Sequence, residues 1–236
     1  GLFFCVPLYL SVALGLSAVE TGIRILPLSI TLLLAAVGVP KIWPQASPQR
    51  VARFGFLGLL AGIVSLMGAL ELGAGPEIVT LPLLLAGLGI GALASQLGAV
   101  TVSSVPDEQS PEVGGLQNTF TNLGASVGTA LAGAILVSAL TTSFFTGIQD
   151  NPAIPETLTS KAQVEFAGGI QFIPDSDLEA ALSKAGITGD TAQAIMEENS
   201  QSRIAGLRAA LAALAVLAIA ALFSTGSLPT RPGQSD

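Results

Sequence analysis

The sequence predicts an all-α integral membrane protein, a bundle of six transmembrane helices with a partly helical loop outside the membrane. Two features of the composition lead to this prediction. Half of the 236 residues are hydrophobic and only 11% are charged, whereas a water-soluble domain carries roughly a quarter charged residues. The charges are also uneven, because more than half of the 16 acids lie between residues 150 and 198. The remaining sequence is therefore less polar than the average, as in a membrane protein with one water-exposed insertion.

Six apolar stretches come close to the roughly 20 residues that a helix needs to cross the hydrocarbon core. Runs such as ITLLLAAVGV (30–39) show no alternation of polar and apolar residues, which favours helices over membrane strands. The first stretch is shortened at its start. Pro27, inside the second, is expected to cause either a harmless kink or a bend used in gating. The predicted spans are residues 1–17, 21–40, 52–72, 79–105, 114–140 and 203–224.

The loop between the second and third spans is basic, with Lys41, Arg50 and Arg53. Because short cytoplasmic loops of membrane proteins carry an excess of lysine and arginine, we place this loop in the cytoplasm. Arg203 and Arg208, near the start of the last span, are expected to extend to the membrane interface. The expected organisation is five spans over 1–140, an extracytoplasmic loop with short helices over 141–202, a last span over 203–224 and a cytoplasmic tail over 225–236.

Within the outside loop, PDSDLEAALSKAG (174–186) has the signals of a short helix. Ser176 and Glu179 have capping-box spacing, and Gly186 fits the end of a helix. A second helix is expected to begin near Asp190 and to run without interruption into the last span. The clustered acids lack the spacing of an EF-hand, so we interpret them as a solvated acidic surface.

The composition excludes several classes of function. Cys5 is the only cysteine, so one chain cannot build a disulfide or a thiolate metal site. Histidine is absent, which removes histidine-based catalytic triads and zinc motifs. A net charge of −7 gives no basic footprint for nucleic acid. We therefore expect no enzymatic activity, no metal, no cofactor and no nucleic-acid partner.

The stretch GGLQNTFTNLGASVGTALAGAIL (114–136) is uncharged, yet its first third is rich in polar side chains. At about 100° per residue, Phe120, Val127 and other apolar residues gather on one side of a helix. An amide that faces lipid without a partner is costly, so the opposite side is expected to face protein or a water-filled cavity. We call this side the polar flank. Its members are Gln117, Asn118, Thr121, Asn122, Gly124, Gly128 and Thr129.

Two roles for the polar flank remain open. Gly124 and Gly128 have the GxxxG spacing that lets another helix approach closely, and amides can form hydrogen bonds across helices. Alternatively, Asn118, Asn122 and Gln117 line the path of a solute. The two roles can coexist on one helix.

The fourth span repeats this pattern in GLGIGALASQLGAV (87–100). Gly87 and Gly91 have GxxxG spacing, and Ser95 and Gln96 are candidate contacts for a solute. The third and last spans have few polar side chains between their ends, and we expect them to be outer, lipid-facing helices.

Two motifs carry a resemblance to a known family. LYLSVALGLSAVETGIRILPLS (8–29) and GGLQNTFTNLGASVGTA (114–130), with a basic loop between them, resemble the C-terminal half of a major facilitator superfamily transporter. They are most similar to the fourteen-helix drug:proton antiporter branch, and the resemblance covers nearly the whole chain. Ser11 stands where the family often has glutamine. KIWPQASPQR (41–50) keeps only the basic character of the usual loop motif, which weakens a gating role for this loop.

The resemblance implies a six-helix bundle that pairs, around a central cavity, with an N-terminal half missing from this chain. It implies proton-coupled efflux of drugs or of hydrophobic or amphipathic small molecules by alternating access. All spans but the third and the last would line the cavity. No acid lies in the middle of a span, so the coupling carboxylates would belong to the missing half. The expected partners are that half, membrane lipid, the substrate and protons, in the plasma membrane of a bacterium.

Two alternatives remain at the level of the sequence. One is a facilitator or importer of a small metabolite with the same fold. The other is a membrane-embedded assembly or sensory module that acts through its outside loop.

Overall fold

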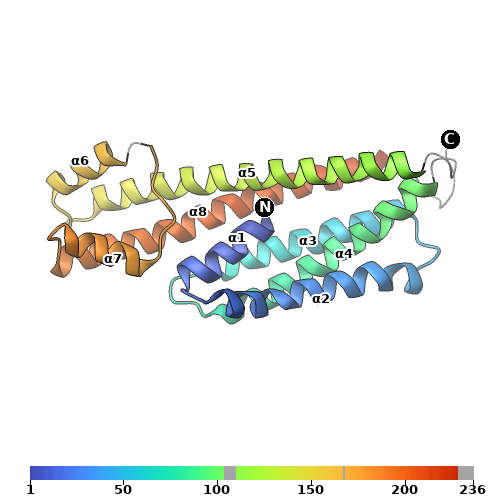
Figure 1. Cartoon of the computed structure of the whole chain (residues 1–236), viewed down its shortest axis with the longest axis horizontal. Coiled ribbons are helices and arrows are strands. Elements are labelled where there is room, and N and C mark those ends of the chain that lie inside the picture. Colours follow the sequence, from blue (N-terminus) through green and yellow to red (C-terminus); the bar gives the residue numbers. More distant parts are fainter. Residues whose placement is uncertain (104–109, 167, 228–236) are drawn as a thin grey trace.

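The computed structural model describes residues 1–103, 110–166 and 168–227. Within these ranges every regular element is helical, and five helices are long and apolar enough to cross a membrane. They run roughly along one long axis (Figure 1). This confirms the prediction of an all-α membrane protein. The five helices are α2 (Ala18–Ile42), α3 (Pro48–Ala69), α4 (Thr80–Ser103), α5 (Ser110–Asp150) and α8 (Gly189–Ser224).

The chain begins with the short helix α1 (Leu2–Leu8), which continues as a π-helical turn, η1 (Tyr9–Ala13). Pro7 has no backbone N–H to donate, and the Ser11 hydroxyl donates to the Pro7 carbonyl at 2.7 Å. Gly15 then adopts a φ of 67°, a left-handed conformation that residues with a Cβ rarely take. Within the first predicted span, the helix therefore covers Leu2–Ala13 and ends before Gly15.

A capping box fixes the start of α2. The Ser17 hydroxyl accepts a hydrogen bond from the Glu20 backbone N–H, and the Glu20 carboxylate accepts one from the Ser17 N–H at 2.9 Å. Pro27 and Pro40 lie inside α2, yet the helix continues through both. The Thr31 hydroxyl donates to the Pro27 carbonyl at 2.8 Å. Pro27, for which we considered a role in gating, thus lies within one continuous helix.

Two helices are much longer than a membrane crossing. At about 1.5 Å per residue, the 41 residues of α5 extend roughly 60 Å and the 36 residues of α8 roughly 54 Å. Figure 1 shows α5 and α8 projecting together beyond the other helices, with α6 (Glu156–Glu165) and α7 (Asp175–Lys184) beside them. We call residues 140–203 the outer module. Because α8 is unbroken from Gly189 to Ser224, the predicted continuity from near Asp190 into the last span is confirmed.

The membrane-length helices pack in the order α5, α8, α3, α4, α2. Glycines allow the close approach: a Cβ on Gly89 would lie 2.5 Å from the Gly55 carbonyl oxygen, and one on Gly206 would lie 2.8 Å from the Leu136 carbonyl oxygen. In this order α3 and α8 lie in the middle and α2 and α5 at the ends, and α3 and α8 still expose apolar side chains such as Val64 and Val216. The shared core includes Leu10, Leu28, Leu83, Leu136, Leu207 and Leu211.

The outer module has a small apolar core of its own. Phe144 and Ile148 of α5 pack with Leu182 of α7 and Ile195 of α8. Burial of these side chains holds the two short helices against the projecting ends of the long ones. The acidic residues of the module therefore lie on a folded unit rather than on an irregular loop.

The boundaries of α7 differ in part from the prediction. Its end is as expected, with Gly186 at a φ of 73°. Its start is not, because Asp175 is already helical and Pro174 occupies the N-cap position. Ser176 therefore lies inside the helix, and the predicted capping box with Glu179 does not form.

Candidate functional site

The first half of α5 carries the polar flank on its surface. Asn118, Thr121 and Asn122 are exposed, and Gln117 is half-buried. The Asn122 side-chain amide donates to the Asn118 side-chain oxygen at 3.2 Å, and the Thr121 hydroxyl donates to the Gln117 carbonyl at 2.9 Å. Spacings of four residues align these side chains on one face of the helix. Each amide keeps further donors and acceptors that can bind a polar group.

The apolar flank of the same helix is equally open. Phe120 is 64% exposed, and Leu123 and Val127 are also exposed. A Cβ on Gly124 or Gly128 would find nothing within 4 Å. The described residues therefore bring no helix against this GxxxG pair, and both flanks of α5 form surface in this chain.

The polar flank ends where α1 meets α5. Thr129 is exposed, whereas Ala132, three residues further on, is fully buried in the core. Thr129 thus lies at the boundary between the packed and the open parts of α5. The amides at 117, 118 and 122 all belong to the open part.

Ser95 and Gln96 of α4 are half-buried. The Gln96 side-chain amide donates to the Ser95 hydroxyl at 3.2 Å, and that hydroxyl donates to the Ala92 carbonyl at 2.6 Å. No hydrogen bond joins these residues to the amides of α5 within the part of the chain that the structure describes. The two groups of predicted site residues are therefore not hydrogen-bonded to each other within the described ranges.

The glycine pair of α4 lies in a helix contact. A Cβ on Gly87 would collide with the Leu28 carbonyl of α2, and one on Gly91 would lie 2.7 Å from the Ala35 Cβ. The two GxxxG pairs thus differ, because the one on α4 packs against α2 and the one on α5 is open.

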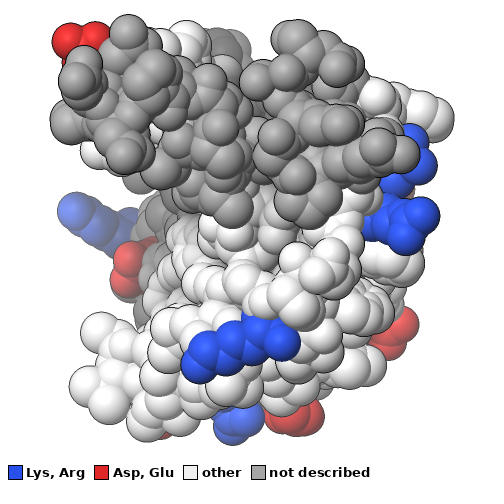
Figure 2. Space-filling view, turned by 90° about the vertical axis from the view of Figure 1, so that its right-hand side faces the viewer, with Lys and Arg blue, Asp and Glu red and all other residues white. Residues whose placement is uncertain are grey.

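The loop between α2 and α3, which the predicted basic residues flank, lies at the end of the molecule opposite the outer module (Figure 1). Figure 2 faces this end and shows lysine and arginine side chains on its described part. Arg53 donates to the Thr225 hydroxyl at 3.4 Å and Gln49 to the Gly226 carbonyl at 3.3 Å, which joins the start of α3 to the end of α8. Lys41 and Arg50 are exposed, and their side chains have no hydrogen-bond partner among the described residues.

Two arginines have roles that sequence reasoning missed. Arg203 is only 3% exposed, and its guanidinium donates to the Ile173 carbonyl at 2.9 Å and to the Asp175 carboxylate at 2.5 Å. Arg208 donates to the carbonyl of Leu70, at the end of α3, at 2.5 Å. Each of them binds a backbone carbonyl of another segment. The available signal was the length of α8, which places Arg203 beyond the membrane core.

The described residues contain no group of three or more His, Cys, Asp or Glu side chains that could hold a metal ion. The polar side chains of α4, and of α5 between Glu112 and Asp150, are uncharged amides and hydroxyls on otherwise apolar helices. Fold and site together define a multi-pass helical membrane protein with an amide-lined flank.

Comparison with curated proteins finds bacterial transporters among the relatives of this chain. The tetracenomycin C resistance and export protein of Streptomyces glaucescens is 36% identical over 145 residues, which are 58% of this chain and 25% of that protein. The multidrug efflux pump LfrA of Mycolicibacterium smegmatis is 29% identical over 77% of this chain and 34% of its own length. An uncharacterized MFS-type transporter of Mycobacterium tuberculosis is 30% identical over 66% of this chain and 23% of its own length.

The chain is a homologue of bacterial transporters of the major facilitator superfamily, and it is a multi-pass bacterial membrane protein. The relatives are transporters rather than enzymes. The aligned region spans about a quarter to a third of the length of these relatives. No family model and no solved structure matches the chain.

Proposed function

We propose that the chain is the C-terminal half of a bacterial exporter of drugs or of hydrophobic or amphipathic small molecules. The relatives named for tetracenomycin C export and for multidrug efflux support this proposal. The exporter works by alternating access, in which this half rocks against an N-terminal half around a central cavity.

The observation that carries the proposal is the amide-lined stretch of α5. Asn118 and Asn122 are one turn apart and exposed, on a helix whose composition suits it for hydrocarbon. Acyl chains give such amides no hydrogen bond, whereas a solute or water in a cavity does. Uncharged amides also suit substrates that are apolar over most of their surface and carry a few polar groups.

Proton exchange needs a titratable group within the membrane. Among the described spans, Glu20 lies in the first turn of α2, where Ser17 already binds its carboxylate. No acid lies in the middle of α2, α3 or α4. The coupling carboxylate is therefore assigned to the N-terminal half.

The proposal is tested by replacing Asn118 or Asn122 with leucine in the full-length transporter. Loss of a hydrogen bond to the solute should lower efflux of the affected compounds by about 3- to 10-fold. The measurement is drug tolerance of a sensitive host, together with dye efflux from cells that contain equal amounts of each variant.

Phe120→Leu is the matched control, because it changes the opposite flank of the same helix turn. It should leave the substrate range unchanged. If both asparagine variants export every compound as the parent does, the amides do not contact the solute and the site assignment is wrong.

A further inference from the structure

A groove separates the end of α2 from the start of α3, beside the basic loop that joins them. Both helices pack along α4, but they make at most slight contact with each other. A cavity of about 480 Å³ lies at the loop end of the groove, and a second of about 200 Å³ lies deeper, on α4. Trp43, Val51 and Phe54 line both cavities, so the two form one continuous groove.

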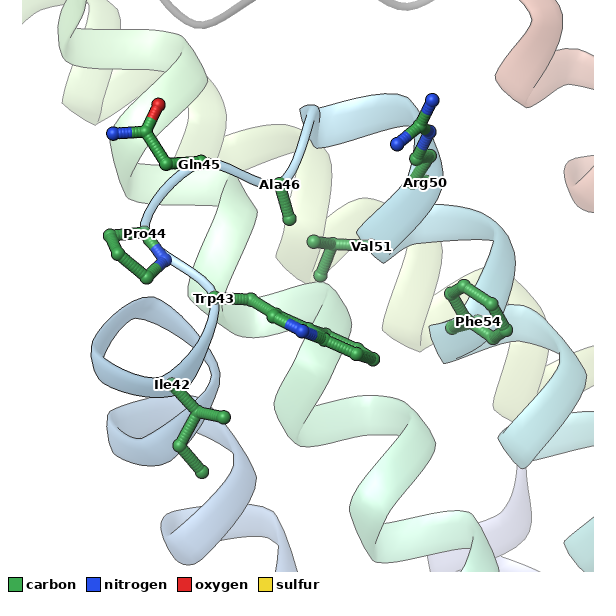
Figure 3. Close-up of a pocket in the computed structure, with 8 residues that line it drawn as sticks. All are labelled: Ile42, Trp43, Pro44, Gln45, Ala46, Arg50, Val51 and Phe54. Carbon is green, nitrogen blue, oxygen red and sulfur yellow. The ribbon is translucent and has the colours of Figure 1, made fainter.

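The walls of the groove are apolar and open to the outside of the bundle. Figure 3 shows the indole of Trp43 reaching from the end of α2 toward Val51 and Phe54 of α3. The rings of Trp43 and Phe54 have centroids 6.2 Å apart, and the two side chains are 58% and 60% exposed. Tryptophan is common at the boundary between hydrocarbon and headgroups because its ring is apolar with one polar group. The deeper cavity continues from this boundary into the membrane-length part, between Val39 of α2 and Gly89 of α4.

The mouth of the groove is cationic. Arg50 lines it and points outward from the rim in Figure 3, and Lys41 precedes it in the last turn of α2. No acid occurs in the sequence between Glu20 and Glu71. Both cations are without a partner in the described part of the chain, unlike Arg53, which binds Thr225.

We propose that this groove binds one anionic glycerophospholipid. Its phosphate lies between Lys41 and Arg50, and one acyl chain follows the apolar walls past Trp43 toward Gly89. A soluble anion would bind the two cations but would not fill the apolar groove. An uncharged hydrocarbon would fill the groove but would not bind the two cations. The combination of an unpaired cationic mouth and a membrane-facing apolar groove fits a molecule with both parts.

The test measures lipid binding to the purified protein by native mass spectrometry. Phosphatidylglycerol is titrated in parallel with phosphatidylcholine of the same acyl chains and with soluble glycerol phosphate. Phosphatidylglycerol should bind the parent more tightly than phosphatidylcholine, and glycerol phosphate should not compete. Equal binding of the two lipids, or effective competition by glycerol phosphate, contradicts the proposal.

Charge variants test the mouth of the groove. Lys41→Gln and Arg50→Gln should each weaken binding of phosphatidylglycerol about fivefold, because each removes one cation near the phosphate. Arg24→Gln is the matched control, since it removes the same charge near the other end of α2. If Arg24→Gln weakens binding as much as Arg50→Gln, the net charge of the protein controls lipid binding and the assigned site is wrong.

A second pair of variants tests the acyl-chain groove. Val39→Phe adds bulk inside the deeper cavity and should reduce phosphatidylglycerol binding several-fold. Val37→Phe adds the same bulk at an exposed position that does not line either cavity, and it should have no effect. Unchanged binding in a folded Val39→Phe protein shows that no acyl chain occupies the groove.

Discussion

At the scale of single residues, charged side chains are few, and three of them bind groups at helix ends or segment junctions. Arg203 is buried and binds the segment before α7 through a backbone carbonyl and the half-exposed Asp175. Arg208 binds a carbonyl at the end of α3. Glu20 caps α2. These charges satisfy backbone groups at helix ends and segment junctions, and none of them lies on the polar flank.

Arg203→Met should loosen α7 from the long helices. The substitution keeps an apolar side chain of similar length but leaves the Ile173 carbonyl without its donor, at a cost of about 1–3 kcal/mol. Hydrogen–deuterium exchange of the α7 amides should therefore become faster. Arg208→Met serves as the control, because its partners lie on α3. Unaltered exchange of α7 in Arg203→Met would show that apolar packing alone holds it.

At the scale of helices, glycine position decides which surfaces can pack. Gly206 lies where α8 crosses α5, and the Leu136 carbonyl and Leu140 side chain leave no room for a Cβ. Gly124 of α5 is also a glycine, yet a Cβ at this position would meet no atom within 4 Å. Glycine therefore serves close packing at the first position, and at the second it leaves an open surface.

Gly206→Ala should destabilise the chain by about 1–3 kcal/mol, because the two helices must move apart. Gly124→Ala should be neutral or stabilising by up to about 1 kcal/mol, because alanine favours the helix at a position with free space. Thermal unfolding of the purified chain in detergent compares the two. An equal loss of stability would show that a segment of this chain also covers Gly124.

Much of the helical framework could be predicted from sequence, because the thickness of the hydrocarbon core fixes how long an apolar helix must be. The continuity of α8 followed from the lack of a helix breaker between Asp190 and the last span. The extension of α5 to Asp150 was not predicted. Residues 141–150 are compatible with a helix but less apolar, and hydropathy does not register a helix that leaves the membrane.

The candidate site was only partly accessible to sequence reasoning. Helical periodicity aligns Asn118 and Asn122, and their side chains are indeed hydrogen-bonded one turn apart. Which helix faces them depends on tertiary packing, which a single sequence does not encode locally. The contacts of Arg203 and the groove beside Trp43 also depend on tertiary packing, so the sequence did not predict them.

At the scale of the whole molecule, the packing order leaves α2 and α5 at the edges, each with an exposed face. Two exposed edges are compatible with the proposal that this chain is one half of a transporter and packs against a second half of similar size. The outer module adds a folded extension at one end, and the basic loop lies at the other.

Residues 1–236 alone should not accumulate substrate against its gradient. The described spans hold no acid in mid-membrane, and exchange of protons with a cavity needs such a group. Dye uptake into proteoliposomes under an imposed proton gradient checks this, with the full-length transporter as the positive control. Gradient-driven accumulation by the chain alone would contradict the assignment of coupling to the other half.

The most direct test of the central claim is the accessibility of the two flanks of α5 in the membrane. Single cysteines replace Asn118, Asn122, Phe120 or Val127 in a full-length transporter whose Cys5 and any other cysteines are removed, and cells are treated with a membrane-impermeant thiol reagent. We predict that positions 118 and 122 react and are protected by substrate, while 120 and 127 do not react. Labelling of 120 and 127, with 118 and 122 inert in lipid, would contradict a solute path along the polar flank.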